Sequence, residues 1–166
     1  GATSTYLAGK AQGNAVIDSF RAAANVPNSG ISLSAPAGIW GYSQGGQTAA
    51  FAAEQLSTYA PELKIVGVAA GGIPGDFFKT ADYLNGSIGF AFLGSAIVGL
   101  GNQYPGQLPI NLLANDEGKA ALEKISTQCV FQALFENQNT NIAQYTRNGI
   151  TLEELLAVES VNVTLD

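Results

Sequence analysis

The chain has 166 residues, a formal net charge of -6, no histidine, 12% charged residues and 46% hydrophobic residues. Its length fits one domain with a real core, and the lack of a Lys/Arg cluster argues against a nucleic-acid partner. The single cysteine, Cys129, excludes an internal disulfide and a cysteine-built zinc site. Two interpretations of Cys129 stay open: it pairs with a thiol elsewhere, or it is a small buried hydrophobe on a helix.

The first predicted element is an amphipathic helix over residues 5–24. Apolar side chains recur there near a helical period, and the sequence Pro-Asn-Ser-Gly at 27–30 punctuates its end. Gly9 and Gly13 disfavour a helix in its first turns. We expect this helix to pack on a sheet and to have a structural role.

The central motif of the chain is Gly-Tyr-Ser-Gln-Gly at residues 41–45, which Gly46 extends. Pro36 cannot donate a ladder hydrogen bond, so we expect the preceding strand to cover Ala37 to Tyr42. The Ala-rich stretch 47–56 predicts a helix directly after the motif. Strand, tight turn and helix are the context in which a Gly-x-Ser-x-Gly pattern holds a nucleophilic serine.

In this context Ser43 is a candidate nucleophile. The passage from strand to helix within one residue forces strained dihedral angles at Ser43, and Gly41 and Gly45 remove side chains that would collide there. The Gln44 N–H at the start of the helix is a candidate donor to an oxyanion. The alternative is a glycine-rich turn that contains a serine by chance, because the sequence has 20 glycines.

A second strand is predicted at residues 64–70, which are β-branched and apolar on both faces, as in a buried parallel strand. Strand, helix and strand then form a crossover unit. The glycine-rich segment 71–76 follows at the carboxyl end of the strand, where open α/β sheets bind ligands. This segment either lets a substrate approach Ser43 or is a plain strand-to-helix turn, and its Asp76 is a candidate catalytic acid.

Strands and helices stop alternating after residue 76, which predicts a partial α/β core over 1–76 and a helical cap over 77–166. The uncharged run 87–100 is shorter than the roughly 20 residues that span a bilayer, and glycines interrupt it. It is either a buried helix whose glycines admit close packing, or a movable cover that meets an acyl chain or a lipid surface. The candidate substrate contacts are Tyr42 of the motif and four residues of this run, namely Phe90, Phe92, Leu93 and Ile97.

Two further helices are predicted in the second part of the chain. One covers residues 115–137, with acidic residues in its first turn and a single apolar stripe. The other begins at the capping box Thr-Leu-Glu-Glu of residues 151–154. Asn85 and Asn162 each begin an Asn-x-Ser/Thr pattern, which would accept a glycan on a eukaryotic secretory route.

The absence of histidine leaves Ser43 without an ordinary general base in this chain. We therefore expect the catalytic acid and base to come from elsewhere, or the chain to be inactive alone. There is no signal-peptide pattern, and the last residues look interrupted. We interpret the sequence as a segment of a longer protein, or as one chain of a processed protein whose second chain carries the missing groups.

Three blocks occur in order, namely Trp-Gly-Tyr-Ser-Gln-Gly-Gly at 40–46, Tyr-Ala-Pro-Glu-Leu at 59–63 and Val-Gly-Val-Ala-Ala-Gly-Gly-Ile-Pro at 66–74. Together they resemble the secretory lipase family of α/β-hydrolases, and the resemblance runs from about Gly9 to the end of the chain. It implies part of an α/β-hydrolase parallel sheet with a mostly helical cap insertion. It also implies a secreted enzyme that cleaves carboxylic esters, often triacylglycerols, at a Ser-His-Asp site without a cofactor.

Within this resemblance, Ser43 matches the nucleophile of the family and Gln44 the position of one oxyanion amide. The first strands and the second oxyanion donor of the family lie upstream of this chain, and its acid and histidine lie downstream. The sequence therefore predicts a serine-dependent ester hydrolase, a secreted lipase acting on acylglycerols with transient lipid contact and no metal. The alternatives are a non-catalytic binding or structural chain derived from a hydrolase, and an acyltransferase or thioesterase that uses the same serine.

Overall fold

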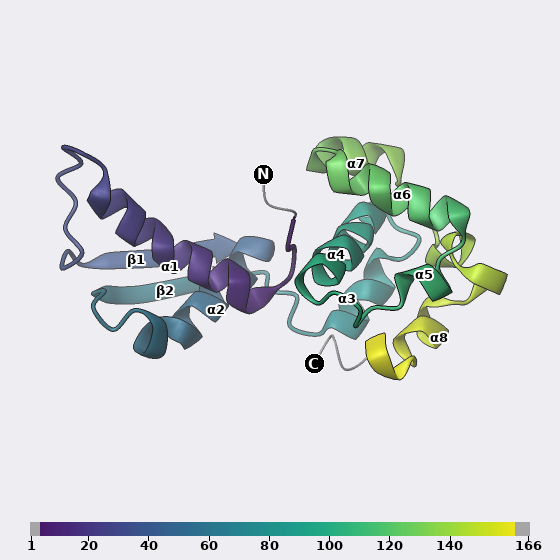
Figure 1. The fold of residues 1–166 in the computed structure, drawn as a ribbon, viewed down its shortest axis with the longest axis horizontal. Helices are drawn as coiled ribbons and strands as arrows, with labels where there is room; N and C mark the ends of the chain where they lie inside the picture. The colour runs from purple at the N-terminus through teal and green to yellow at the C-terminus, as the bar shows by residue number, and fades with distance from the viewer. Residues whose placement is uncertain (1–3, 162–166) are drawn as a thin grey trace. The chain divides into compact units, whose positions relative to one another are not determined.

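The computed structural model describes residues 4–161 and is predominantly helical (Figure 1). Its strands and α-helices are α1 (Gly9–Asn25), β1 (Ala37–Tyr42), α2 (Gln44–Tyr59), β2 (Ile65–Gly71), α3 (Phe77–Leu84), α4 (Phe90–Gln103), α5 (Ile110–Leu113), α6 (Asp116–Thr127), α7 (Val130–Glu136) and α8 (Leu152–Leu156). Two 3-10 helices, Ile142–Tyr145 and Arg147–Gly149, precede α8.

The chain divides into two compact units. The elbow unit comprises Leu7–Gly75, and the helical unit comprises the described residues from Asp76 onward together with Ser4 to Tyr6. The chain therefore passes between the units twice, at Tyr6–Leu7 and at Gly75–Asp76.

In the elbow unit, β1 and β2 form a parallel pair whose register runs from Ala37 opposite Ile65 to Tyr42 opposite Gly71. The predicted strand over residues 37–42 is confirmed, and the second strand begins one residue later than predicted. Helix α2 packs against both strands. Ile17 of α1, Ile39 of β1 and the small residues Ala49, Ala52 and Ala60 form the buried core of this unit.

The glycines near the start of α1 allow this helix to pack closely on α2. A Cβ on Gly9 would collide with the ring of Phe51, and a Cβ on Gly13 would lie 2.9 Å from the backbone nitrogen of Ala52. The helix begins at Gly9, four residues later than the start of the helix predicted over 5–24. The two glycines lower the helix propensity of α1, but they are what the contact with α2 requires.

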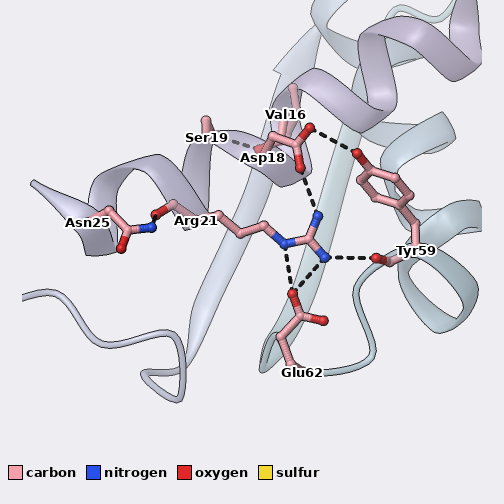
Figure 2. A network of polar contacts seen from close by, with 7 residues as sticks. All are labelled: Val16, Asp18, Ser19, Arg21, Asn25, Tyr59 and Glu62. Atoms are coloured by element: carbon pink, nitrogen blue, oxygen red, sulfur yellow. Dashed lines mark hydrogen bonds and ion pairs between the residues drawn. The ribbon is translucent and has the colours of Figure 1, made fainter.

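Arg21 joins the C-terminal half of α1 to the last residue of α2 and to the segment that connects α2 and β2 (Figure 2). Its guanidinium donates to Asp18 Oδ1, to Glu62 Oε1 and to the carbonyl oxygen of Tyr59, each at 2.8 Å. The Tyr59 hydroxyl donates to the second oxygen of Asp18 at 2.9 Å, and the Arg21 guanidinium carbon lies 5.0 Å from the centre of the Tyr59 ring. We call this set of four residues the Arg21 cluster.

In the helical unit, the core is formed by buried side chains from α3, α4, the first 3-10 helix and α8. These are Ala81, Phe90, Leu93, Ile142, Leu152 and Leu155. Two glycines of α4 admit close neighbours: a Cβ on Gly94 would meet Ile125 of α6 at 2.7 Å, and one on Gly99 would collide with the backbone of Tyr6. Of the two interpretations of residues 87–100, these contacts fit the buried, closely packed helix.

The single helix predicted over residues 115–137 is wrong, because the backbone turns extended at Gln128 and Cys129, with ψ of 153° and 154°. The interruption brings Glu136 back to Lys124, whose Nζ lies 2.7 Å from its carboxylate. In a straight helix these residues would be about 18 Å apart along the axis. Cys129 consequently precedes α7 as an exposed free thiol, and is not the buried hydrophobe of the second interpretation.

One local prediction for this unit is confirmed. The capping box at Thr151 is present, with its side chain accepting from the Glu154 N–H and the Glu154 carboxylate accepting in return. The side-chain oxygen of Asn85 accepts from the Ile142 N–H at 2.8 Å, whereas an N-linked glycan would be attached to the nitrogen of this amide. Asn162, the other glycosylation candidate, lies outside the described residues.

Candidate active site

Ser43 occupies the single residue between β1 and α2. Its φ and ψ are 56° and -120°, a conformation that costs a non-glycine residue of order 1–3 kcal/mol. Two backbone hydrogen bonds hold it there: the Ser43 N–H donates to the Gly71 carbonyl at 2.9 Å, and its own carbonyl accepts from the Gln47 N–H at 3.0 Å. The residue is exposed, and its hydroxyl does not cap α2. A strained, exposed serine with a free hydroxyl is the arrangement that a nucleophile needs.

The glycines around Ser43 contribute unequally. A Cβ on Gly41 would collide with the Gly45 carbonyl, and a Cβ on Gly46 would collide with the Gly71 carbonyl. A Cβ on Gly45 would meet no atom within 4 Å among residues 4–161. The prediction that a side chain at position 45 would collide with its surroundings is therefore wrong. Such a collision would occur at Gly46 instead. The pair of adjacent glycines at 45 and 46 was the feature of the sequence that could have indicated it.

Gln44 is the first residue of α2, a helix of 16 residues with no acidic side chain in its first turn. The first N–H groups of a helix have no intrahelical acceptor, and the helix dipole adds partial positive charge there. The Gln44 N–H belongs to the residue that directly follows Ser43, and it lies at the positive end of the helix dipole. This environment favours a developing oxyanion.

Tyr42 flanks the serine on the strand side. Its side chain is 77% exposed, and its ring lies over the turn that follows β2, where a Cβ on Gly72 would approach it to 2.8 Å. Gly72 has a φ of 59°, so the turn needs glycine for its backbone as well as for the ring. Tyr42 is thus positioned at the carboxyl end of both strands, beside Ser43.

The four apolar candidates on α4 have different environments. Phe90 and Leu93 are 2% and 8% exposed and belong to the core of the helical unit, so they offer no free surface to a ligand in this structure. Phe92 and Ile97 are only half-buried. Sequence pattern alone could not separate these pairs, because all four residues are apolar members of one run.

Asp76, the candidate acid, caps α3. Its carboxylate accepts from the Lys79 N–H and pairs with the Lys79 ammonium, both at 2.9 Å. The Lys79 backbone and side chain together hold the pKa of Asp76 below its usual value. The carboxylate is therefore committed to the helix start. No carboxylate of residues 4–161 hydrogen-bonds to Ser43, and the sequence supplies no imidazole.

The helical unit also contains an open groove of about 610 Å³ between the C-terminal end of α4, α5 and α6. Its walls combine apolar side chains such as Leu108 and Leu122 with Lys119 and Glu123. No group of three or more His, Cys, Asp or Glu side chains that could hold a metal occurs within residues 4–161. Over the same range, no helix has the length and apolar character to cross a membrane.

The strand, the one-residue turn at a strained serine and the following helix have the backbone arrangement of a nucleophile elbow in an α/β hydrolase. Two solved structures of Candida antarctica lipase A share this fold with the chain. The closed state superposes with a TM-score of 0.81 at 27% identity, covering 95% of this chain and 36% of that one. The second structure gives a TM-score of 0.76 with the same coverage.

The chain belongs to the secretory lipase family, whose model matches residues 1–166. A protein of Mycobacterium tuberculosis named as a probable inactive lipase is 34% identical over 90% of this chain and 33% of its own length. Lipase 10 of Candida albicans is 32% identical over 81% of this chain and 30% of its own. A secreted triacylglycerol lipase of Malassezia furfur is 27% identical over 87% of this chain and 30% of its own length. The chain thus spans about a third of the length of these relatives.

Proposed function

We propose that this chain carries the nucleophile of a secreted, serine-dependent carboxylic ester hydrolase that acts on acylglycerols. The observation that carries the proposal is the backbone of Ser43, which is held in a strained conformation with its hydroxyl exposed. Ser43 combines this strain with a position directly between a strand and a helix, which is the arrangement that a nucleophile elbow requires. Membership of the secretory lipase family supports both the ester chemistry and the extracellular location.

In the proposed reaction, Ser43 Oγ attacks the ester carbonyl and the Gln44 N–H donates to the oxyanion that forms. One such donor is worth roughly 3 kcal/mol of transition-state stabilisation. A histidine takes the serine proton and returns it to the leaving alcohol, and an acidic residue orients that histidine. Both groups would come from residues outside this sequence, since it has no histidine and Asp76 is committed to α3.

We propose that Tyr42, beside Ser43, contacts the acyl chain. Within the helical unit, which we propose to be the cap, Phe92 and Ile97 of α4 remain candidate acyl contacts, because they keep exposed surface, unlike Phe90 and Leu93.

The full-length protein should react with a fluorophosphonate probe at Ser43 and hydrolyse acylglycerols. Ser43→Ala should abolish labelling and lower kcat by a factor of about 10⁴ or more, because the whole triad acts through this hydroxyl. Ser57→Ala is the matched control, since Ser57 is an exposed serine on α2, the helix that follows Ser43. Labelled peptide mass spectrometry and ester-hydrolysis kinetics measure the two effects.

A non-catalytic chain is the second candidate, because one relative is named as a probable inactive lipase and this chain lacks histidine. Absence of labelling in the full-length protein, with ester hydrolysis no faster than in Ser43→Ala, would favour that candidate. Labelling with an alcohol or thiol acceptor preferred over water would instead favour an acyltransferase or thioesterase.

A further inference from the structure

Gln47 is a buried polar residue in the first turn of α2, four positions after Ser43. Its side chain is only 3% exposed, and its Nε2 donates to the carbonyl oxygen of Leu7 at 3.3 Å. Its Oε1 is buried and has no hydrogen-bond partner among residues 4–161. A buried amide that is only partly satisfied opposes folding, so its presence needs an explanation beyond stability.

The partner of Gln47 is itself unusual. Leu7 has a φ of 65°, in the left-handed region that a bulky side chain rarely adopts. It is also the residue at which the chain enters the elbow unit from the helical unit. On the other side of this junction, the backbone of Tyr6 lies against Gly99 of α4, and the Ser4 carbonyl accepts from Asn102 Nδ2 at 2.8 Å.

Gln47 thus makes two hydrogen bonds that have different structural roles. Its backbone N–H donates to the Ser43 carbonyl at 3.0 Å and so helps to fix the elbow. Its side chain donates to Leu7 and so helps to hold a strained junction. Both groups belong to one residue at the start of α2, so Gln47 is bonded both to the turn that contains Ser43 and to Leu7.

We propose that Gln47 is a positioning residue that couples the Tyr6–Leu7 junction of the two units to the orientation of Ser43. The role of Ser43 in this statement rests on the proposed function, whereas the link to the junction does not. Release of the Leu7 carbonyl lets Leu7 leave its left-handed conformation, which loosens the attachment of residues 4–6 and changes the geometry of the elbow.

Gln47→Met in the full-length protein tests the proposal, because methionine has a similar length and lacks the amide. Gln55→Met is the matched control: Gln55 Nε2 links α2 to α1 through the Lys10 carbonyl at 3.4 Å, but lies about three turns from Ser43. The first measurement is cleavage of the Tyr6–Leu7 bond by a protease that cuts after aromatic residues, followed as a new terminus at Leu7. The second is the rate of fluorophosphonate labelling of Ser43.

We expect Gln47→Met to raise the cleavage rate about tenfold, which corresponds to the loss of one net hydrogen bond, and to slow labelling by a similar factor. Gln55→Met should change neither rate. Leu7→Gly should restore the labelling rate in the Gln47→Met background, because glycine adopts the left-handed conformation without support.

Unchanged cleavage in Gln47→Met would overturn the link to the junction. Faster cleavage with unchanged labelling would overturn the coupling to Ser43. If the wild-type protein is not labelled at all, the proposed function and the coupling to a reactive serine both fail, while the cleavage measurement still decides whether Gln47 holds the junction.

Discussion

At the scale of single residues, the elbow depends on how closely β2 approaches α2. The Gly71 carbonyl accepts the Ser43 N–H and also occupies the space that a Cβ on Gly46 would need. Gly46 therefore lets the end of β2 come near enough to fix the serine backbone. Gly45, although it completes the Gly-x-Ser-x-Gly pattern, has open space at its Cβ position among the described residues.

This difference predicts opposite results for two neighbouring alanine substitutions. Gly46→Ala should destabilise the protein by about 1–3 kcal/mol, the usual cost of overpacking, and slow labelling of Ser43. Gly45→Ala should be neutral or stabilising by up to about 1 kcal/mol, because alanine favours a helix. Urea unfolding and probe labelling measure both. Equal damage from the two substitutions would mean that atoms outside residues 4–161 approach Gly45.

The conformation of Ser43 was predictable because the cause lies within a few residues of sequence. A strand, a turn and a helix that follow each other directly leave few backbone solutions, and glycines mark the crowded positions. Gln47 was not predictable, since its partner Leu7 is 40 positions away. The buried state of Phe90 and Leu93 was missed for the same reason: it depends on α3 and α8, which pack on α4 only in the folded chain.

At the scale of elements, the Arg21 cluster ties α1 to the segment between α2 and β2 (Figure 2). The hydrogen bond from Arg21 lowers the pKa of Asp18, and Tyr59 adds to that effect. A backbone N–H and Arg21 together lower the pKa of Glu62. Both carboxylates are thus stabilised as anions in the folded state. Their contribution to stability is complete above the ordinary carboxyl pKa and is lost as the pH falls toward the lowered values.

Arg21→Met should therefore lower the Tm by a few degrees at pH 7, and the difference from the wild type should shrink as the pH falls below about 4. The pairs are exposed, so the effect should also be smaller in high salt. Arg21→Lys, the control, keeps the charge but loses the fork of donors, and should recover only part of the Tm. Thermal melts from pH 3 to 7 measure this. A Tm difference that grows in acid would contradict the assignment.

The predictions for elements succeeded where a local signal was sufficient. The strand after Pro36 and the helix at the Thr151 capping box were found because proline and the Thr–Glu pair act on adjacent backbone. The helix predicted over residues 115–137 was wrong because a continuous apolar stripe gave no sign of the break at Gln128. Pairing of Lys124 with Glu136 is a contact across that break, and helical periodicity carries no information about it.

At the scale of the whole molecule, the two-stranded sheet is covered on one face only by the described residues of the elbow unit. Ile39 points toward the helices and is 6% exposed, whereas Trp40, on the opposite face, is 84% exposed. Parallel strands in α/β proteins are normally covered on both faces, and this chain spans about a third of the length of its relatives. We expect further residues of the full-length protein to cover Trp40.

Trp40 is the single tryptophan of this sequence, so its fluorescence shows whether this face of the sheet is covered. In the 166-residue chain its emission should be that of an indole in water and should be readily quenched by acrylamide. In the full-length protein, the difference spectrum between wild type and Trp40→Phe should be shifted to the blue and resist quenching. Equal quenching in both would mean that this sheet face stays open.

The helical unit is built from two separate pieces of sequence. This limits how the unit can be exchanged between family members by recombination. A recombinant that takes only residues 76–161 from another member of the family would bring in a foreign α4 while keeping the native Ser4 to Tyr6. Any donor with a side chain at the position of Gly99 would then clash with Tyr6. Chimeras that transfer both pieces together should therefore fold where single-segment chimeras fail.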